Sequence, residues 1–282
     1  MSKLLQRLLI FFIGLPVVIG LVFLRTYHQL PLHIVICIFS VIGSMELYDI
    51  FSKNSPMPPK LLVIVLNALL PVSTYVFILL GLPFNYTSWV FMFGALIIMG
   101  YSVLSSKTFE HSNTSIALSV LILFYCGFLV TFISRMTIYD YAVYYIAVFL
   151  FMVFICDSVA WLFGMLFGKN NRGVIAASPN KSIAGFVGGY IGCIAAAVLT
   201  HMLWPSVFPG RLWKSFVFGA LIATSAIVGD LVESVFKRSA NLKDSGFIMP
   251  GRGGVLDSID SVLFTAPVFY VALHIFYGVV LF

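Results

Sequence analysis

The residues best suited to chemistry lie in the segment 229–261, where acidic, basic and glycine residues interrupt an otherwise apolar chain. Carboxylates from two helix ends can hold a hard divalent cation through their oxygens. Cationic side chains beside a glycine-rich turn can neutralise phosphate oxygens. The segment holds five acids and four bases, which are Asp230, Glu233, Asp244, Asp257, Asp260, Lys237, Arg238, Lys243 and Arg252. Together they predict a metal-assisted site for phosphate-bearing ligands.

The spacing within this segment favours a built site over a simple basic loop. Asp230, Glu233 and Lys237 stand at i, i+3 and i+7, which places them on one face of a helix. Three glycines within 251–254 permit positive φ or a close approach of the backbone to a ligand. The alternative is a loop attracted to acidic lipid headgroups, in which the carboxylates are only local ion partners.

A second group of polar residues lies upstream. Asp157 stands inside the apolar run 151–168, where a carboxylate is costly unless it is paired or binds a ligand. The alternative is a hydrogen bond or ion pair that only serves helix packing. Ser178 and Asn180 can cap the helix that follows, and a ligand-binding role for Lys181 is compatible with such a cap.

Composition places the chain in a bilayer. Hydrophobic residues make up 61% of the chain and charged residues 9%, whereas soluble domains carry roughly 25% charged residues. The net charge of +6 is explained better by membrane topology and anion binding than by nucleic-acid binding. The cysteines lie in apolar runs without zinc-like spacing, so we expect four small buried hydrophobic residues, namely Cys37, Cys126, Cys156 and Cys193.

Nine apolar runs are long enough to cross a membrane, because a span needs about 20 residues. They cover 8–24, 30–48, 61–81, 84–104, 115–134, 141–167, 183–204, 215–236 and 261–282. We expect an all-α, polytopic protein with N-terminal scaffold helices in 1–140 and a C-terminal catalytic region in 141–282 that contains the signature 229–261. The run 8–24 lacks a small-residue cleavage site, so we interpret it as a retained span.

The distribution of Lys and Arg predicts the orientation. With nine spans and the N-terminus inside, 12 of the 16 Lys and Arg residues fall in inner loops, in agreement with the positive-inside rule. The segment 237–260 then lies on the inner side. The acids of the first half fall at or near loops and are expected to belong to the scaffold; they are Glu46, Asp49, Glu110 and Asp140.

Four glycines in the run 183–204 give overlapping G-x-x-x-G spacing, and they are Gly185, Gly188, Gly189 and Gly192. No strand precedes them, which argues against a nucleotide-binding loop. The spacing predicts close packing against another helix.

The segment 229–261 resembles the C-terminal signature of the phosphatidate cytidylyltransferase (CDP-diacylglycerol synthase) family. The shared pattern, at intact spacing, is Ser234-x-x-Lys237-Arg238, Lys243-Asp244, Pro250-Gly251-Arg252-Gly253-Gly254 and Asp257-Ser258-Ile259-Asp260. Gly229-Asp230, Glu233, the region of Asp157 and 178–181 are also similar. Two positions depart, because Arg252 stands where the family has a histidine and Ser258 where it has an arginine.

The resemblance implies an enzyme that converts CTP and phosphatidic acid into CDP-diacylglycerol and pyrophosphate with Mg²⁺. It implies Asp230 and Asp257 as metal ligands. The implied catalytic residues are Lys237, Arg238, Lys243, Asp244 and Asp260. The implied substrate-binding residues are Asp157, Ser178, Asn180, Lys181, Glu233, Arg252 and Gly253.

The expected location is a bacterial cytoplasmic (inner) membrane, with several spans and the active site facing the cytoplasm. The expected partners are CTP, phosphatidic acid and membrane lipids, without nucleic acid, and a homodimer is left open. A CTP-dependent polyprenol or isoprenoid-alcohol kinase is an alternative that would transfer the γ-phosphoryl group instead. A cation-coupled transporter is another, but its charges are expected near mid-membrane in two related halves, whereas here they crowd the second half.

Overall fold

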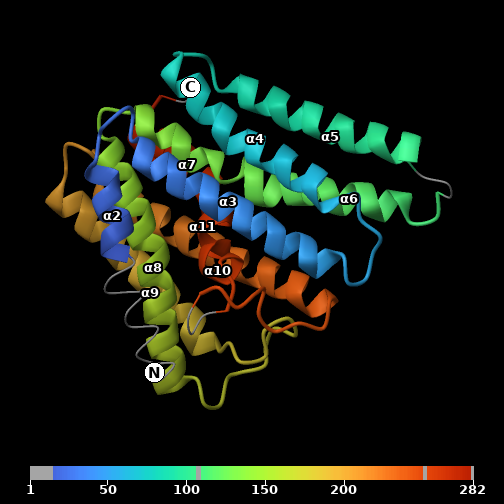
Figure 1. Cartoon of the computed structure of the whole chain (residues 1–282). Helices are drawn as coiled ribbons and strands as arrows, with labels where there is room; N and C mark the ends of the chain where they lie inside the picture. The colour runs from blue at the N-terminus through green and yellow to red at the C-terminus, as the bar shows by residue number, and fades with distance from the viewer. Residues whose placement is uncertain (1–14, 106–108, 250–252, 281–282) are drawn as a thin grey trace. The chain divides into compact units, whose positions relative to one another are not determined.

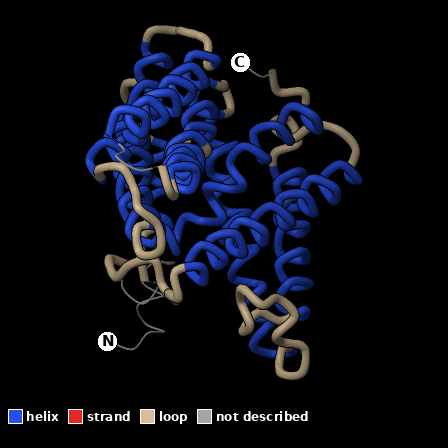
Figure 2. Tube along the Cα trace, turned by 90° about the vertical axis from the view of Figure 1, so that its right-hand side faces the viewer, coloured by secondary structure: helices blue, strands red, loops and turns tan. Residues whose placement is uncertain are grey.

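The computed structural model describes residues 15–105, 109–249 and 253–280, and the regular elements within these ranges are helices (Figures 1 and 2). Eight of the described helical segments are long and apolar enough to cross a membrane. They are α3 (Leu30–Phe51), α4 (Lys60–Leu79), α5 (Asn85–Ser105), the compound segment Ser112–Ile138, α8 (Ala142–Phe167), α9 (Ile183–Leu203), α10 (Leu212–Ser239) and α11 (Leu256–Tyr277). The prediction of an all-α, multi-pass membrane protein is confirmed.

The predicted spans and the helices differ most at the two ends of the chain. The first predicted span, 8–24, lies partly outside the described residues, and its described part contains the short helix α2 (Leu15–Phe23). The last helix begins at Leu256 instead of residue 261. It therefore includes Asp257 and Asp260.

The fifth predicted span is not a uniform α-helix. It consists of α6 (Ser112–Ile122), the π-helix η2 (Leu123–Phe128), α7 (Thr131–Arg135) and the 3₁₀-helix η3 (Met136–Ile138). A neighbouring helix stabilises the π-helix η2, because the Ser40 hydroxyl of α3 donates to the carbonyl of Cys126 at 2.8 Å. Asn67 of α4 donates in turn to that hydroxyl at 3.0 Å. An external donor thus satisfies a carbonyl inside the π-helix.

The chain divides into two compact units, and each is described by itself. The first unit comprises the described residues up to Ile138 and those of 236–259; the second comprises those of 139–235 and those from Asp260 onward. In the first unit, α3, α4 and α5 pack side by side (Figure 1). The Asn54 amide, just after α3, donates to the carbonyl of Ser239 at the end of α10, at 2.5 Å. The loops after α3 and α10 therefore share one side, as the Lys and Arg count predicts.

The second unit is built on a close contact between α8 and α9. A Cβ at Gly188 would lie 2.6 Å from Cβ of Phe163, and one at Gly192 would lie 3.0 Å from Cβ of Val159. These glycines let the two backbones approach where any side chain would collide, and the prediction of glycine-mediated helix packing is confirmed. The cysteines are free; Cys126, Cys156 and Cys193 are buried as expected, but Cys37 is only half-buried.

Candidate active site

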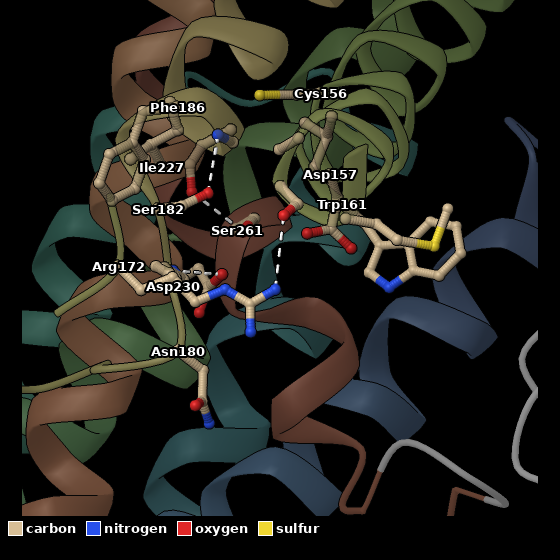
Figure 3. A pocket seen from close by; sticks show the side chains of 17 residues that line it. Cys156, Asp157, Trp161, Arg172, Asn180, Ser182, Phe186, Ile227, Asp230 and Ser261 are labelled. Carbon is tan, nitrogen blue, oxygen red and sulfur yellow. Dashed lines mark hydrogen bonds and ion pairs between the residues drawn. The ribbon is translucent and has the colours of Figure 1, made fainter. Parts of the chain in front are cut away.

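The second unit encloses a cavity of about 350 Å³ (Figure 3). Its wall combines one face of α8, the loop 168–182, the first turn of α9, α10 and the beginning of the second unit's part of α11. The charged lining residues are Asp157, Arg172, Lys181 and Asp230. Two carboxylates and two cations thus face one space that also presents Trp161 and Met165, so the cavity suits a ligand with both charged and apolar parts.

Lys181 and Asp230 form the central ion pair of this cavity, with the ammonium nitrogen 2.5 Å from Oδ2 of the carboxylate. Their side chains are 24% and 31% exposed. α10 presents the aspartate. The loop 168–182 is folded back by the antiparallel bridge between Arg172 and Ser182 and presents the lysine. A phosphate could replace Asp230 as the partner of Lys181, and a divalent cation could replace Lys181 as the partner of Asp230, because both side chains stay accessible.

The helix cap beside Lys181 differs from the prediction. Ser182, not Ser178 or Asn180, is the N-cap of α9, and its hydroxyl accepts the backbone N–H of Gly185 at 3.0 Å. The cap expected at Ser178 or Asn180 is wrong because α9 begins at Ile183, several residues later than those side chains can reach. Asn180 lines the cavity, whereas the described lining residues do not include Ser178.

The position of Asp157 on α8 explains why a carboxylate is tolerated in this apolar helix. Asp157 is exposed although it stands in a membrane-spanning helix, and it lines the cavity together with Trp161, one turn further on (Figure 3). Arg172 reaches back to α8 and donates to the carbonyl of Gly164 at 3.4 Å. The carboxylate therefore faces a polar space within the unit, as expected of a functional charge at membrane depth.

A second charged arrangement lies in the first unit, where the end of α10 meets the start of α11. The Lys237 ammonium lies 2.5 Å from Oδ1 of Asp257, and their side chains are 11% and 7% exposed. Oδ2 of Asp257 accepts the backbone N–H groups of Ser245 at 2.8 Å and Gly254 at 2.7 Å, and lies 3.0 Å from the Ser245 hydroxyl. Asp257 is thus bound by protein donors on both oxygens.

Glycine is required next to this carboxylate. Gly253 has φ +111°, and a Cβ there would lie 2.5 Å from Oδ2 of Asp257 and 2.9 Å from Cβ of Asp244. The predicted need for positive φ in the turn is met at this position. Gly253 therefore shapes the turn; its predicted contact with substrate stays a prediction.

Glu46 is the residue of this turn that sequence reasoning missed. It was expected at or near a loop of the scaffold, and that expectation is wrong. Glu46 is buried in α3, and its carboxylate accepts the backbone N–H groups of Val255 at 2.9 Å and Leu256 at 2.7 Å. The signal was available, because Glu46 falls inside the predicted span 30–48, where an ionised side chain needs partners.

The other predicted site residues occupy different settings. Glu233 and Asp260 are buried in the second unit, at 0% and 7% exposure. Arg238 is exposed and donates to the carbonyl of Leu242 at 2.8 Å, and Lys243 and Asp244 are exposed on the turn. Arg252 lies outside the described residues. The convergence of Asp230 with Asp257 would join the two units and stays a prediction.

The donor set fits magnesium only if the substrate supplies further ligands. Among the described residues, no three His, Cys, Asp or Glu side chains are placed to hold a metal ion together. Mg²⁺ commonly takes just one or two carboxylates and completes its shell with phosphate oxygens and water. Asp230 and Asp157 meet this demand because they line the same cavity. Asp257 fits less well, since protein donors already bind both of its oxygens.

The helices and the cavity define a multi-pass membrane protein whose second unit contains a cavity lined by both acidic and basic side chains. A sequence profile of the cytidylyltransferase family matches residues 5–276. The chain therefore belongs to the cytidylyltransferase family, and it is a nucleotidyltransferase. The resemblance noted from the signature segment is confirmed.

Individual relatives agree with this assignment. The chain is 32% identical over 209 residues to the phosphatidate cytidylyltransferase of Staphylococcus saprophyticus, covering 72% of this chain and 78% of the relative. It is 33% identical over 177 residues to the proteins of the same name from Staphylococcus haemolyticus and Staphylococcus aureus. Those two matches cover 63% of this chain and 65% of each relative.

Proposed function

We propose that this protein transfers the cytidylyl group of CTP to phosphatidic acid, giving CDP-diacylglycerol and pyrophosphate for phospholipid synthesis. The observation that carries the proposal is the match of nearly the whole chain to the cytidylyltransferase family, together with relatives named phosphatidate cytidylyltransferase. The cavity around Lys181 and Asp230 supports it, because charged and apolar groups share one wall, as a lipid phosphate requires.

The reaction is a displacement at phosphorus. An oxygen of the phosphatidate phosphate forms a bond to the α-phosphorus of CTP, the bond from that phosphorus to the β-bridging oxygen breaks, and pyrophosphate leaves. The protein's part is to orient the two substrates and to offset their negative charge. Lys181 and Arg172 line the cavity, and we assign them to binding phosphate oxygens. We assign the same task to Lys237, Arg238, Lys243 and Arg252.

We propose that Asp230 holds magnesium, with Asp157 as a second carboxylate of the same cavity and Asp257 as the further ligand expected from the signature. When bound, Mg²⁺ offsets charge on the triphosphate. We assign Asp244, Asp260 and Glu233 to the support of this site, and Ser178, Asn180 and Gly253 to substrate contacts.

We further propose that the protein lies in a bacterial inner membrane with the turn 237–260 facing the cytoplasm. The excess of Lys and Arg in the predicted inner loops supports this orientation. So does the contact between Asn54 and Ser239, which joins two of these loops. CTP in the cytoplasm can then reach this turn directly. A homodimer stays an expectation.

The direct test supplies purified protein in detergent with phosphatidic acid, Mg²⁺ and CTP labelled at the α-phosphate. The label should move into a chloroform-soluble liponucleotide while pyrophosphate appears in equal amount. Diacylglycerol in place of phosphatidic acid is the control without an attacking phosphate. In a parallel reaction that supplies a polyprenol, release of CDP with a phosphorylated polyprenol would favour the alcohol kinase, and folded protein that gives neither product would overturn the proposal.

A further inference from the structure

Glu46 stands apart from the other acids of the first half. It is 6% exposed and lies in a membrane-spanning helix, yet it accepts two backbone N–H groups from the turn between α10 and α11, and the Ser245 hydroxyl lies beside it. Val255 donates its backbone N–H to Oε1 at 2.9 Å, and Leu256 donates to Oε2 at 2.7 Å. The Ser245 hydroxyl lies 3.0 Å from Oε2. The carboxylate thus occupies the N-terminal end of α11, where free N–H groups and the helix dipole favour an anion.

The turn is shaped around this carboxylate. A Cβ at Gly246 would lie 2.6 Å from Oε1 of Glu46, and a Cβ at Gly254 would lie within van der Waals overlap of Oε2. Close contact with the Glu46 carboxylate therefore explains why positions 246 and 254, in the turn between α10 and α11, are glycines. A side chain at either position would collide with the Glu46 carboxylate and displace the turn.

Further contacts connect Glu46 to Lys237 at the end of α10. The Ser245 hydroxyl lies 3.0 Å from Oε2 of Glu46 and 3.0 Å from Oδ2 of Asp257, and a hydroxyl has one proton to donate. Asp257 in turn binds the Lys237 ammonium through Oδ1. Glu46, Ser245, Asp257 and Lys237 form one connected series within the first unit.

We infer that Glu46 is a positioning residue for the cytidylyl transfer. It fixes the turn at the start of α11, and through Ser245 and Asp257 it sets the place of the Lys237 ammonium. Glu46 itself touches no reacting atom. The inference rests on the proposed function, because the effect on catalysis is expected in that reaction.

The test begins with Glu46→Gln in the full-length protein. The glutamine keeps one carbonyl oxygen but turns its NH₂ group toward a backbone N–H. One of the two hydrogen bonds from the backbone N–H groups of Val255 and Leu256 is therefore lost. We expect kcat to fall about 10- to 100-fold, the scale of a lost hydrogen bond to a charged group. The matched control is Asp49→Asn, which removes a carboxylate from the same helix where it pairs with Lys60 at an exposed position. That variant should keep the wild-type rate.

Amide hydrogen exchange separates positioning from general instability. Peptides containing the Val255 and Leu256 amides should exchange faster in Glu46→Gln, while peptides from α4 exchange as in the wild type. Equal acceleration in α4 would show that Glu46 serves only general stability and would overturn the inference. This readout needs no turnover, so it stands even if the wild-type protein makes no CDP-diacylglycerol, a result that would defeat the proposed function alone.

A double-mutant cycle tests whether Glu46 acts through Ser245. If Glu46 acts through Ser245, then Glu46→Gln should cost only a few-fold in kcat when Ser245→Ala is already present, because coupled residues are not additive. Independent, multiplying effects of the two substitutions would contradict the proposed connection. A wild-type kcat in Glu46→Gln would contradict the role altogether.

Discussion

The Lys181 ammonium lies 2.5 Å from a carboxylate oxygen of Asp230, and both side chains remain partly exposed at the wall of a cavity. The pair between Lys237 and Asp257 has the same separation but is almost fully buried. An exposed pair contributes little to stability, whereas removing one partner of a buried pair leaves an uncompensated charge. The first pair is therefore suited to exchange partners with a ligand, and the second is suited to hold a turn in place.

Asp230→Asn should abolish most turnover and leave the fold intact. The substitution keeps the side-chain volume but removes the charge proposed to bind magnesium, and metal charge stabilisation is worth several kcal/mol. We expect a loss of at least about 100-fold, since each 1.36 kcal/mol is tenfold in rate. Initial rates against magnesium concentration measure the effect. Asp140→Asn, in the predicted outer loop, should change little, and near-normal turnover in Asp230→Asn would remove the metal assignment.

Asp257→Asn should lower both turnover and stability, in contrast to Asp230→Asn. The amide would turn an NH₂ group toward donors that now bind the carboxylate, and Lys237 would lose its ion pair with Asp257. Breaking a buried ion pair costs about 3–5 kcal/mol, so the thermal unfolding midpoint in detergent should fall clearly below that of Asp230→Asn. Equal midpoints for the two variants would contradict the structural role given to Asp257.

Lys181→Met should raise the KM for CTP. The lysine is proposed to bind a phosphate, and a charge-assisted hydrogen bond is worth about 1.5–3 kcal/mol, so we expect an increase of about 10-fold or more. Lys60→Met offers a matched control, because Lys60 forms an equally short pair with Asp49 and neither residue lines the cavity. Parallel changes in both variants would point to a general effect of removing a cation.

Gly188→Ala should destabilise the protein, because the added methyl group would meet Phe163 and the carbonyl of Val159. Overpacking of this kind costs about 1–3 kcal/mol. Gly100→Ala in α5 is the control, since nothing lies within 4 Å of its added Cβ. Thermal unfolding in detergent compares the two. A midpoint for Gly188→Ala at or above that of Gly100→Ala would show that α8 and α9 are not closely packed there.

Cysteine labelling tests the orientation. In a cysteine-free background, single cysteines at the exposed positions Lys53 and Lys243 should react with an impermeant reagent only from the cytoplasmic side. Arg211→Cys, in a predicted outer loop, should react only from the other side. Lys53→Cys and Lys243→Cys must agree with each other in any case, because Asn54 and Ser239 are hydrogen-bonded. Labelling of both from the outside would reverse the proposed orientation.

Helix-forming segments were predictable because an apolar run of span length has few alternatives in a bilayer. The glycine face of α9 was predictable for a similar local reason, since its spacing repeats with the helix. The cap at Ser182 was not, because it depends on where α9 begins. The need of Glu46 for partners was predictable from its place inside a span, but the partners themselves were not, because these donors lie 209 and 210 residues away. Spacing within one segment carries no information about a partner so distant.

That distance has a consequence for how the protein is made. Glu46 leaves the ribosome about 200 residues before the amides that bind it, and at about 5–20 residues per second this interval lasts roughly 10–40 s. For that time a membrane-spanning helix carries an acid whose final partners do not yet exist. A transcript or nascent chain cut short before Val255 leaves that acid permanently without them. Such a chain keeps an ionisable side chain in a membrane-spanning helix without its native donors, which is a costly arrangement in the bilayer.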